Sequence, residues 1–313
     1  MTTYLVTGGA GFIGSHLVEA LLQQGAQVRV LDNLSSGRLD NLAAVDGQFE
    51  LISGDVQDMS ACRQAVDGVE VVFHLAALAS VPASLAAPDS THDACLTGTV
   101  RMLDAARQQK IRRFVYASSS SLYGNCSDQV QSETDLPVPE SPYAAAKLGG
   151  EQYCQAFYRS FGLETVCLRY FNVFGPRQDP ASQYAAVIPA FITAVLRGDS
   201  PVIFGDGGQT RDFTYVDNVV QANLLAAGAE DATGGTFNIA NGNGTSLLEL
   251  LDLLRDLLDL SIEPRHDPPR SGDVRHSRAD IGRAREVLGY QPTAGLAEGL
   301  APTIEYYRGC QGA

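Results

Sequence analysis

The fold is decided by a stretch near the start of the chain, where residues 4–23 read YLVTGGAGFIGSHLVEALLQ. The apolar run that ends at Thr7 predicts a strand, and the apolar residues after Gly14 recur at helical spacing. The glycines between them form a tight turn, where a phosphate can approach backbone N–H groups at the positive end of the helix dipole. Glycine alone is weak evidence for a ligand, because any tight turn can use it.

An acidic residue stands at the end of the next predicted strand. Asp32 follows Gly14 by 18 residues, a spacing at which a carboxylate can hold both ribose hydroxyls of an adenosine. The same carboxylate would repel a 2′-phosphate, so the pattern favours NAD over NADP. Arg38 leaves NADP open as the alternative, because an arginine shortly after this strand can pair with that phosphate.

Short β-branched runs alternate with helical patterns through the first half of the chain. Strands separated by helix-length segments imply right-handed crossovers and a Rossmann-like α/β fold, which is a doubly wound parallel sheet with helices on both faces. The predicted strands are residues 4–7, 27–31, 50–52, 69–74, 113–117 and 164–169.

Beyond Asn172 the pattern changes, because prolines break shorter elements and one long helix stands out over residues 246–260. We expect the nine leucines of this helix to form a core face. The sequence thus predicts two units. The first is a dinucleotide-binding domain over residues 1–171, to which parts of 212–240 return. The second is a smaller C-terminal α/β substrate domain over residues 172–313.

Charge and cysteine content exclude several classes of partner. The formal net charge of −14 argues against nucleic acid and anionic membranes, which are normally bound by clustered Lys and Arg. The six cysteines are scattered without metal-ligand spacing or a disulfide framework, so we expect no metal site and reduced thiols in a cytoplasmic protein. No apolar run approaches the length needed to span a bilayer.

A phenol and an ammonium stand four residues apart in the sequence YAAAK, at Tyr143 and Lys147. On a helix the two side chains share one face, and a cation beside a phenol favours the phenolate, which can exchange a proton with a substrate hydroxyl near neutral pH. Lys147 is one of two lysines in the chain, so chance explains the pair poorly. Upstream, the predicted strand 113–117 runs into four serines, whose hydroxyls would face the ligand crevice at the carboxyl edge of the sheet.

Together these motifs make the chain resemble, over essentially its whole length, the extended short-chain dehydrogenases/reductases of the NAD-dependent epimerase/dehydratase family. The resemblance implies bound NAD and a catalytic serine at Ser119, with Tyr143 as the base and Lys147 as its helper. One departure stands at Cys95, where family members often carry asparagine. The implied cofactor contacts are Gly8, Gly11, Phe12, Ile13, Gly14, Asp32, Asn33, Asp55, Val56, Leu75, Ala76, Ala77, Tyr143, Lys147 and Phe171.

The residues after Ser119 bear on the reaction. Family dehydratases carry Asp-Glu there and the decarboxylases usually keep a Glu, whereas this chain has Ser120 and Ser121. The resemblance therefore favours epimerisation, in which the C4 hydroxyl of a nucleotide sugar is oxidised to a ketone and reduced again on the other face, with no net redox change. Two alternatives stay open: a dehydratase, decarboxylase or reductase of the same family, and a non-catalytic dinucleotide-sensing module.

A UDP-sugar is the substrate that the second half implies by resemblance. Arg211 and Arg270 match the family's diphosphate contacts, and Ser277 is small at the position that flanks the sugar C2 substituent. We therefore expect interconversion of UDP-GlcNAc and UDP-GalNAc, with UDP-glucose and UDP-galactose as additional substrates. The resemblance also implies a homodimer paired through helices near residues 92–109 and 143–161. The implied substrate contacts are Ser119, Ser120, Ser121, Tyr143, Asn172, Val187, Phe204, Arg211, Arg270, Asp273 and Ser277.

Overall fold

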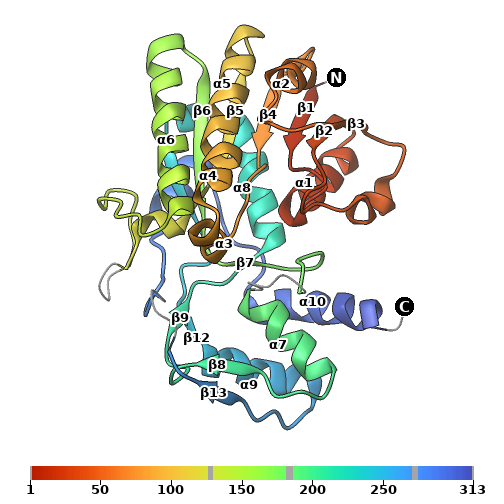
Figure 1. The fold of residues 1–313 in the computed structure, drawn as a ribbon, viewed down its shortest axis with the longest axis vertical. Helices are drawn as coiled ribbons and strands as arrows, with labels where there is room; N and C mark the ends of the chain where they lie inside the picture. The colour runs from red at the N-terminus through yellow and green to blue at the C-terminus, as the bar shows by residue number, and fades with distance from the viewer. Residues whose placement is uncertain (1, 126–129, 181–185, 270–273, 312–313) are drawn as a thin grey trace.

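The computed structural model describes residues 2–125, 130–180, 186–269 and 274–311, and its centre is a seven-stranded parallel sheet (Figure 1). The strands are β1 (Thr3–Thr7), β2 (Gln27–Asp32), β3 (Glu50–Ser53), β4 (Val71–His74), β5 (Arg113–Ser119), β6 (Glu164–Tyr170) and β11 (Thr236–Ile239). Their order is β11-β6-β5-β4-β1-β2-β3, so the chain winds outward from β1 in both directions. The doubly wound prediction is confirmed, and each of the six predicted strands is present within two residues of its expected ends.

Helices cover both faces of this sheet, each over its own apolar core. The longer ones are α1 (Phe12–Gln23), α2 (Met59–Val66), α5 (Gly98–Gln108), α6 (Pro142–Phe161) and α8 (Val216–Gly228). Helices α1 and α8 pack over one face with Val6, while α2, α5 and α6 pack over the other with Leu5. Both side chains are fully buried although they are neighbours in β1, as expected for an inner strand of a parallel sheet.

Short elements complete this half of the molecule. They are η1 (Leu39–Val45), α3 (Val81–Ala86), α4 (Pro88–His92), η2 (Asp93–Thr97), η3 (Ser120–Tyr123) and η4 (Glu230–Ala232). Most of them lie at the connections between strands and helices, and η2 is a stretch of π-helix that leads directly into α5.

The chain returns to the sheet twice after leaving it at Tyr170. Helix α8 and strand β11 fall within the region 212–240 that the sequence analysis singled out, and β11 pairs in parallel with β6. The later segment η5 (Ala284–Leu288) also joins the sheet core, where Tyr290 is fully buried. The sequence did not indicate this second return, because its apolar residues are too few to show a period.

A smaller region carries the rest of the chain and occupies the lower part of Figure 1. Its elements are β7 (Val173–Phe174), α7 (Val187–Leu196), β8 (Val202–Phe204), β9 (Thr210–Arg211), β10 (Thr214–Tyr215), β12 (Thr245–Ser246), α9 (Leu247–Leu258), β13 (Arg265–Asp267) and α10 (Leu296–Gln311). Helices α7, α9 and α10 share one apolar core. The expectation of a single long helix here is wrong, because α10, with 16 residues, is longer than α9, with 12.

Helix α9 has the core face expected of a leucine-rich helix. Leu247, Leu250, Leu251, Leu254 and Leu258 are buried. Its start at Ser246 is a capping box with Glu249, in which each side chain accepts from the other residue's backbone N–H. Among the described residues, no helix is long and apolar enough to cross a membrane.

Candidate active site

The turn between β1 and α1 leaves no room for a Cβ at two of its glycines. Gly8 has φ +68°, and a Cβ on it would lie 2.9 Å from the backbone nitrogen of Ala76. A Cβ on Gly14 would lie 2.1 Å from the carbonyl oxygen of Gly8. Gly11 is the N-cap of α1 and no side chain caps this helix end, so its first N–H groups are left for a ligand or water. Such donors fit the diphosphate of a dinucleotide.

Asp32 packs against this turn from the end of β2. Its Oδ2 accepts a hydrogen bond from Ala10 N at 2.9 Å, and its Oδ1 accepts one from Leu34 N at 2.8 Å. Arg38, the residue that left NADP open, lies 3.6 Å from the Asp179 carboxylate. A carboxylate at the end of β2, with the nearby arginine paired to another acid, fits an unphosphorylated adenosine ribose.

Most other predicted cofactor contacts line the same carboxyl edge of the sheet. Asn33 Nδ2 donates to Asp55 Oδ2 at 2.7 Å, which links the segments after β2 and β3. After β4, the N–H groups of Leu75 and Ala76 each lie 3.2 Å from Thr7 Oγ1, to which they donate. The other members of the set, in the first turn of α1 or shortly after a strand, are Phe12, Ile13, Val56 and Ala77.

Phe171 and Asn172 follow β6 and behave differently. The Phe171 side chain is fully buried, with its ring centroid 6.1 Å from that of Tyr123, so any contact with a ligand would come from its backbone. Asn172 has φ +30°, and its carbonyl oxygen accepts a hydrogen bond from Thr214 N at 3.2 Å. Strained backbone of this kind occurs most often at functional positions.

Helix α6 begins and ends at residues suited to those places. Ser141 is the N-cap, and its hydroxyl accepts from Ala144 N at 3.2 Å. Pro142 occupies the first turn, where a missing N–H does no harm, and Gly162 ends the helix in the left-handed conformation. These signals fix which residues of α6 lie next to the end of β5.

Ser119, Tyr143 and Lys147 come together at the carboxyl end of β5, as the sequence predicted. Tyr143 is hydrogen-bonded to the Ser119 side chain. One helical turn later, Lys147 Nζ lies 6.0 Å from the Tyr143 ring centroid and donates to Ala117 O at 2.7 Å. A phenol, a hydroxyl and an ammonium thus share one buried corner between strand and helix.

Burial dominates the protonation of this pair. It raises the pKa of the Tyr143 phenol, Cys95 adds to the increase, and the hydrogen bond to Ser119 opposes it. Burial also lowers the pKa of the Lys147 ammonium, against the effect of neighbouring groups such as Cys95. Burial therefore opposes the phenolate in the protein alone, and the effect of Lys147 on the Tyr143 phenol stays a prediction.

Ser120 and Ser121 form the turn η3 directly after Ser119. Ser121 Oγ donates to Ser119 Oγ at 2.9 Å, and Ser121 N donates to the same oxygen at 3.2 Å. The neighbours of Ser119 in this turn are therefore hydroxyl groups, and neither Ser120 nor Ser121 has a carboxylate side chain.

Cys95 lies in η2 beside the catalytic pair. It is fully buried, and its Sγ is 3.9 Å from Leu78 O, a long contact for a weak thiol donor. A small and nearly apolar group stands where an asparagine amide would offer two stronger polar groups.

Arg211 and Ser277 come together in the smaller region, and Phe204 lines a hollow of the same region. Arg211 Nη1 donates to Thr210 O at 2.8 Å, and Ser277 N donates to the same oxygen at 3.1 Å. Ser277 is 7% exposed. Phe204 ends β8 and lines a hollow of about 280 Å³. The other residues that line it are Gly205, Asp206, Gln209, Pro269, Val274 and Arg275.

The remaining predicted substrate contacts in this part of the chain are Val187, Arg270 and Asp273. Val187 is the first residue of α7 and packs against the core of the smaller region. Arg270 and Asp273 lie outside the described residues.

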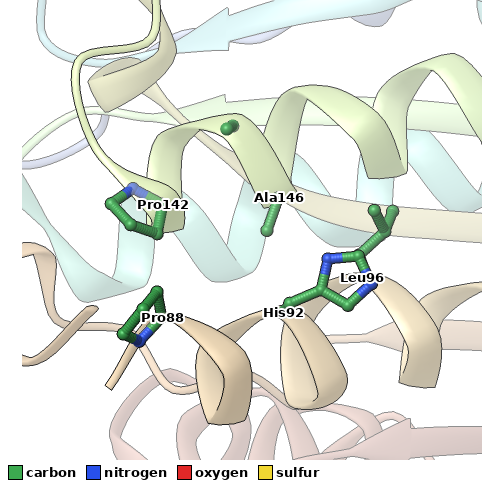
Figure 2. A pocket seen from close by; sticks show the side chains of 6 residues that line it. Pro88, His92, Leu96, Pro142 and Ala146 are labelled. Atoms are coloured by element: carbon green, nitrogen blue, oxygen red, sulfur yellow. The ribbon is translucent and has the colours of Figure 1, made fainter. Parts of the chain in front are cut away.

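The outer side of α6 bears an apolar hollow of about 350 Å³. Figure 2 shows Pro142 and Ala146 of α6 facing Pro88 and His92 of α4 across it. Further along the same helix, Tyr153 is 44% exposed. This apolar lining is unsuited to phosphate, although it lies beside the catalytic residues in the sequence.

Sequence reasoning missed a buried charge pair behind the catalytic residues. Glu151 and Arg169 lie 2.8 Å apart, with side chains 1% and 6% exposed. One signal was available: Glu151 follows Lys147 by four residues, as Lys147 follows Tyr143, which places all three on one stripe of the helix. Within the described part of the chain, no group of three or more His, Cys, Asp or Glu could hold a metal ion.

Comparison with known proteins agrees with this geometry. The model of the NAD dependent epimerase/dehydratase family matches residues 4–240. The UDP-glucose 4-epimerase of Mycolicibacterium smegmatis is 44% identical over 97% of this chain and 98% of its own length.

Two solved structures share the whole fold. The UDP-glucose 4-epimerase of Thermotoga maritima with UDP-glucose has a TM-score of 0.94 and 40% identity, covering 99% of this chain and 100% of its own. The UDP-N-acetylglucosamine 4-epimerase of Methanobrevibacter ruminantium in complex with UDP-N-acetylmuramic acid has a TM-score of 0.95 and 39% identity, covering 99% of each chain. With a family match over well more than half of its length, the chain belongs to the NAD-dependent epimerase/dehydratase family, and its cofactor is NAD.

Proposed function

We propose that this protein is a UDP-sugar 4-epimerase that interconverts UDP-GlcNAc and UDP-GalNAc, and in addition UDP-glucose and UDP-galactose. The observation that carries the proposal is the corner formed by Ser119, Tyr143 and Lys147 next to a turn without acids. Relatives named as UDP-glucose and UDP-N-acetylglucosamine 4-epimerases support it.

The glycine turn and Asp32 would hold NAD at the carboxyl edge of the sheet. When bound, NAD supplies a hydride acceptor for the sugar carbon C4 and returns the hydride to the opposite face. Tyr143 accepts the C4 hydroxyl proton and gives it back in the second half of the reaction, while Ser119 holds the same oxygen.

The base strength of Tyr143 has to come from its surroundings. Burial raises the pKa of its phenol in the protein alone, so the proton leaves only when positive charge lies close to the oxygen. Lys147 is the cation that this chain supplies, on the same face of α6 and 6.0 Å from the ring. The charge balance of this corner therefore controls the rate of the proton transfer.

Elimination of water is disfavoured by the same turn. A dehydratase needs an acid and a base beside the catalytic hydroxyl, and Ser120 and Ser121 hold those places. Glu151 lies one turn beyond Lys147 but is bound to Arg169 through both carboxylate oxygens. Epimerisation needs only one proton shuttle, which Tyr143 provides.

The smaller region would bind the nucleotide. Arg211 on β9 suits one phosphate, and Phe204 in the hollow beside it suits the uracil ring. Arg270 and Asp273 are proposed contacts to the other phosphate and the ribose, Val187 a contact to the base, and Asn172 one to the diphosphate or sugar. Ser277 is small, and a small residue beside the C2 substituent leaves volume for an acetamido group.

We further propose that the protein is a cytoplasmic homodimer paired through α5 and α6. The apolar hollow beside Pro142 and the exposed ring of Tyr153 support this surface. Light scattering behind size exclusion would give twice the mass of 33.3 kDa, and Tyr153→Asp would shift it toward the single chain. A wild-type mass of one chain would contradict the dimer.

The enzyme assignment is tested by incubating the purified protein with UDP-GlcNAc and no added cofactor, with products followed by chromatography. We expect UDP-GalNAc to accumulate to an equilibrium ratio. Net formation of NADH, or a stable keto sugar, would point to the reductase or dehydratase alternative.

A variant at the catalytic phenol separates an enzyme from a sensing module. Tyr143→Phe removes the proton shuttle and should lower kcat by about a thousandfold or more while bound NAD and Tm stay near the wild type. Tyr153→Phe, at an exposed tyrosine of the same helix, is the matched control and should keep full activity. If both variants were equally active, Tyr143 would not be a catalytic residue.

A further inference from the structure

The contacts around Glu151 point to a second pair of residues that serves the reaction. We infer that Glu151 and Arg169 form a buried ion pair that positions Lys147 and the end of β5, and so acts on proton transfer without touching the substrate. The inference rests on the function proposed above and adds positioning residues to it.

The Glu151 carboxylate joins three elements. Its Oε1 accepts from Ser118 Oγ of β5 at 2.5 Å and from Arg169 Nε of β6 at 2.9 Å. Its Oε2 accepts from Arg169 Nη2 at 2.8 Å. Because a buried bidentate pair has one favourable geometry, helix α6 is fixed in register against the two strands.

Arg169 also makes a hydrogen bond away from Glu151. Arg169 Nη1 donates to Tyr123 OH at 2.7 Å, and that hydroxyl donates to Asn238 Oδ1 on β11 at 2.7 Å. A buried polar network in which the members satisfy one another is rigid and specific in shape. The ion pair is therefore connected to β11 as well as to β5 and β6.

The catalytic residues are attached to the same two elements. Lys147 Nζ donates to Ala117 O at 2.7 Å, one residue before Ser118. Tyr143 is hydrogen-bonded to Ser119, one residue after it. Successive turns of α6 thus contact three successive residues of β5. A displacement of Glu151 would therefore change the distances among Ser119, Tyr143 and Lys147.

Charge adds a second effect to this geometry. Burial lowers the pKa of Lys147, and the negative charge of Glu151 opposes that decrease. Loss of the pair would therefore leave less ammonium at alkaline pH. The titratable and charged groups that face Lys147 are Tyr143, Glu151 and Cys154 on α6, Cys95 on η2, His74 on β4, Tyr116 on β5, and Arg169 on β6 by way of Glu151.

The chain offers a matched control pair on the same two strands. Arg113 begins β5 and lies 3.0 Å from Glu164, which begins β6. Arg113 is 2% exposed, like its counterpart, but the pair is at the amino end of the strands, about 20 Å from Ser119 at the usual strand rise. Glu164 is 41% exposed and Glu151 is 1% exposed, so the control matches the two strands and the charges but not the burial of the acid.

The test compares two charge-neutral double variants, Glu151→Gln with Arg169→Gln and Arg113→Gln with Glu164→Gln. Double variants are used because removal of one partner would leave a charged side chain without its counter-ion and destabilise the protein strongly. Lys110 and Lys147 are the two lysines of the chain, so side-chain ¹³C-labelled lysine gives two NMR signals that report each pKa directly. The kcat and KM for UDP-GlcNAc are measured over the same pH range.

In the Glu151/Arg169 variant we expect the Lys147 signal to titrate at lower pH than in the wild type, while the Lys110 signal is the same in both proteins. We expect kcat at pH 8 to fall about tenfold with KM nearly constant, and its alkaline limb to move with the Lys147 titration. The Arg113/Glu164 variant should match the wild type in all three readings.

One result would contradict the positioning role, and another would contradict the proposed function. An unchanged Lys147 titration together with a wild-type pH profile would overturn the positioning role. A shifted Lys147 titration in a protein whose wild type never converts a UDP-sugar would support the positioning role and overturn the proposed function instead.

Discussion

The two halves of the molecule offer different parts of the chain as candidate ligand contacts. In the half around the sheet, the turn after β1 is made of backbone, and a Cβ on Gly14 would lie 2.1 Å from Gly8 O. In the smaller half, the candidate contacts are side chains such as Phe204 and Arg211, mounted on short strands. A backbone site accepts almost no substitution, whereas a side-chain site changes its selectivity by single replacements.

The largest expected effect comes from adding one carbon to the backbone site. Gly14→Ala places a Cβ against the Gly8 carbonyl, so the turn has to open and the diphosphate loses its N–H donors. We expect the purified variant to carry less than about a tenth of the wild-type NAD, measured by release on denaturation, with Tm lowered by several degrees.

Gly228→Ala is the control for this substitution. Nothing lies within 4 Å of the added Cβ, and the residue ends α8 far from the turn in sequence. Its NAD content should equal that of the wild type, and equal losses in the two variants would mean that the turn is not the cofactor site.

The smaller half depends on a buried carboxylate, that of Asp212, to hold its segments together. Asp212 accepts backbone hydrogen bonds from Asn241 and Gly242 at 3.0 and 3.1 Å and from Ala279 at 3.1 Å. Burial raises its pKa to about 6, against the effect of those hydrogen bonds. Asp212 thus ties β9 to the segments that carry Gly242 and Ser277.

Asp212 therefore gives the stability a pH dependence with a definite sign. The folded protein holds this proton more tightly than the unfolded chain, so the contribution is complete below about pH 4 and is lost as pH rises to about 6, by about 3 kcal/mol in total. Urea unfolding at pH 4, 5, 6 and 7 measures it. Asp212→Asn should remove this part of the slope, and an unchanged slope would show that Asp212 does not titrate in this range.

A smaller and more selective effect is expected at Ser277. Ser277→Tyr adds a ring at a position that is 7% exposed, and on the proposed binding mode it fills the volume of the acetamido group. We expect kcat/KM for UDP-GlcNAc to fall about tenfold to a hundredfold more than that for UDP-glucose. Ser277→Ala keeps the space and should preserve the ratio, while equal losses on both substrates in the tyrosine variant would refute the steric account.

Sequence reasoning reached the first half more easily than the second for a physical reason. Strands buried on both faces read as apolar runs, and a glycine turn between such a strand and a helix is visible in a short window. The corner of Ser119, Tyr143 and Lys147 could be predicted because helical spacing joins two of the residues and the end of a strand carries the third.

The rest depends on contacts between distant residues. Glu151 and Arg169 are 18 positions apart on different elements, and no local pattern shows that they pair. Burial raises the pKa of the Tyr143 phenol, and the sequence shows the neighbouring lysine but not this burial. The short strands β9 and β12 have two residues each, too few for any period.

The central claim is that a sugar C4 hydride leaves and returns within one active site. It is tested most directly with UDP-GlcNAc that carries deuterium at C4, incubated in ordinary water without added cofactor and followed by NMR. The account predicts UDP-GalNAc with the deuterium still at C4, at the same enrichment as the substrate. Loss of the label to solvent, or a product whose C4 configuration is unchanged while the label is gone, would contradict it.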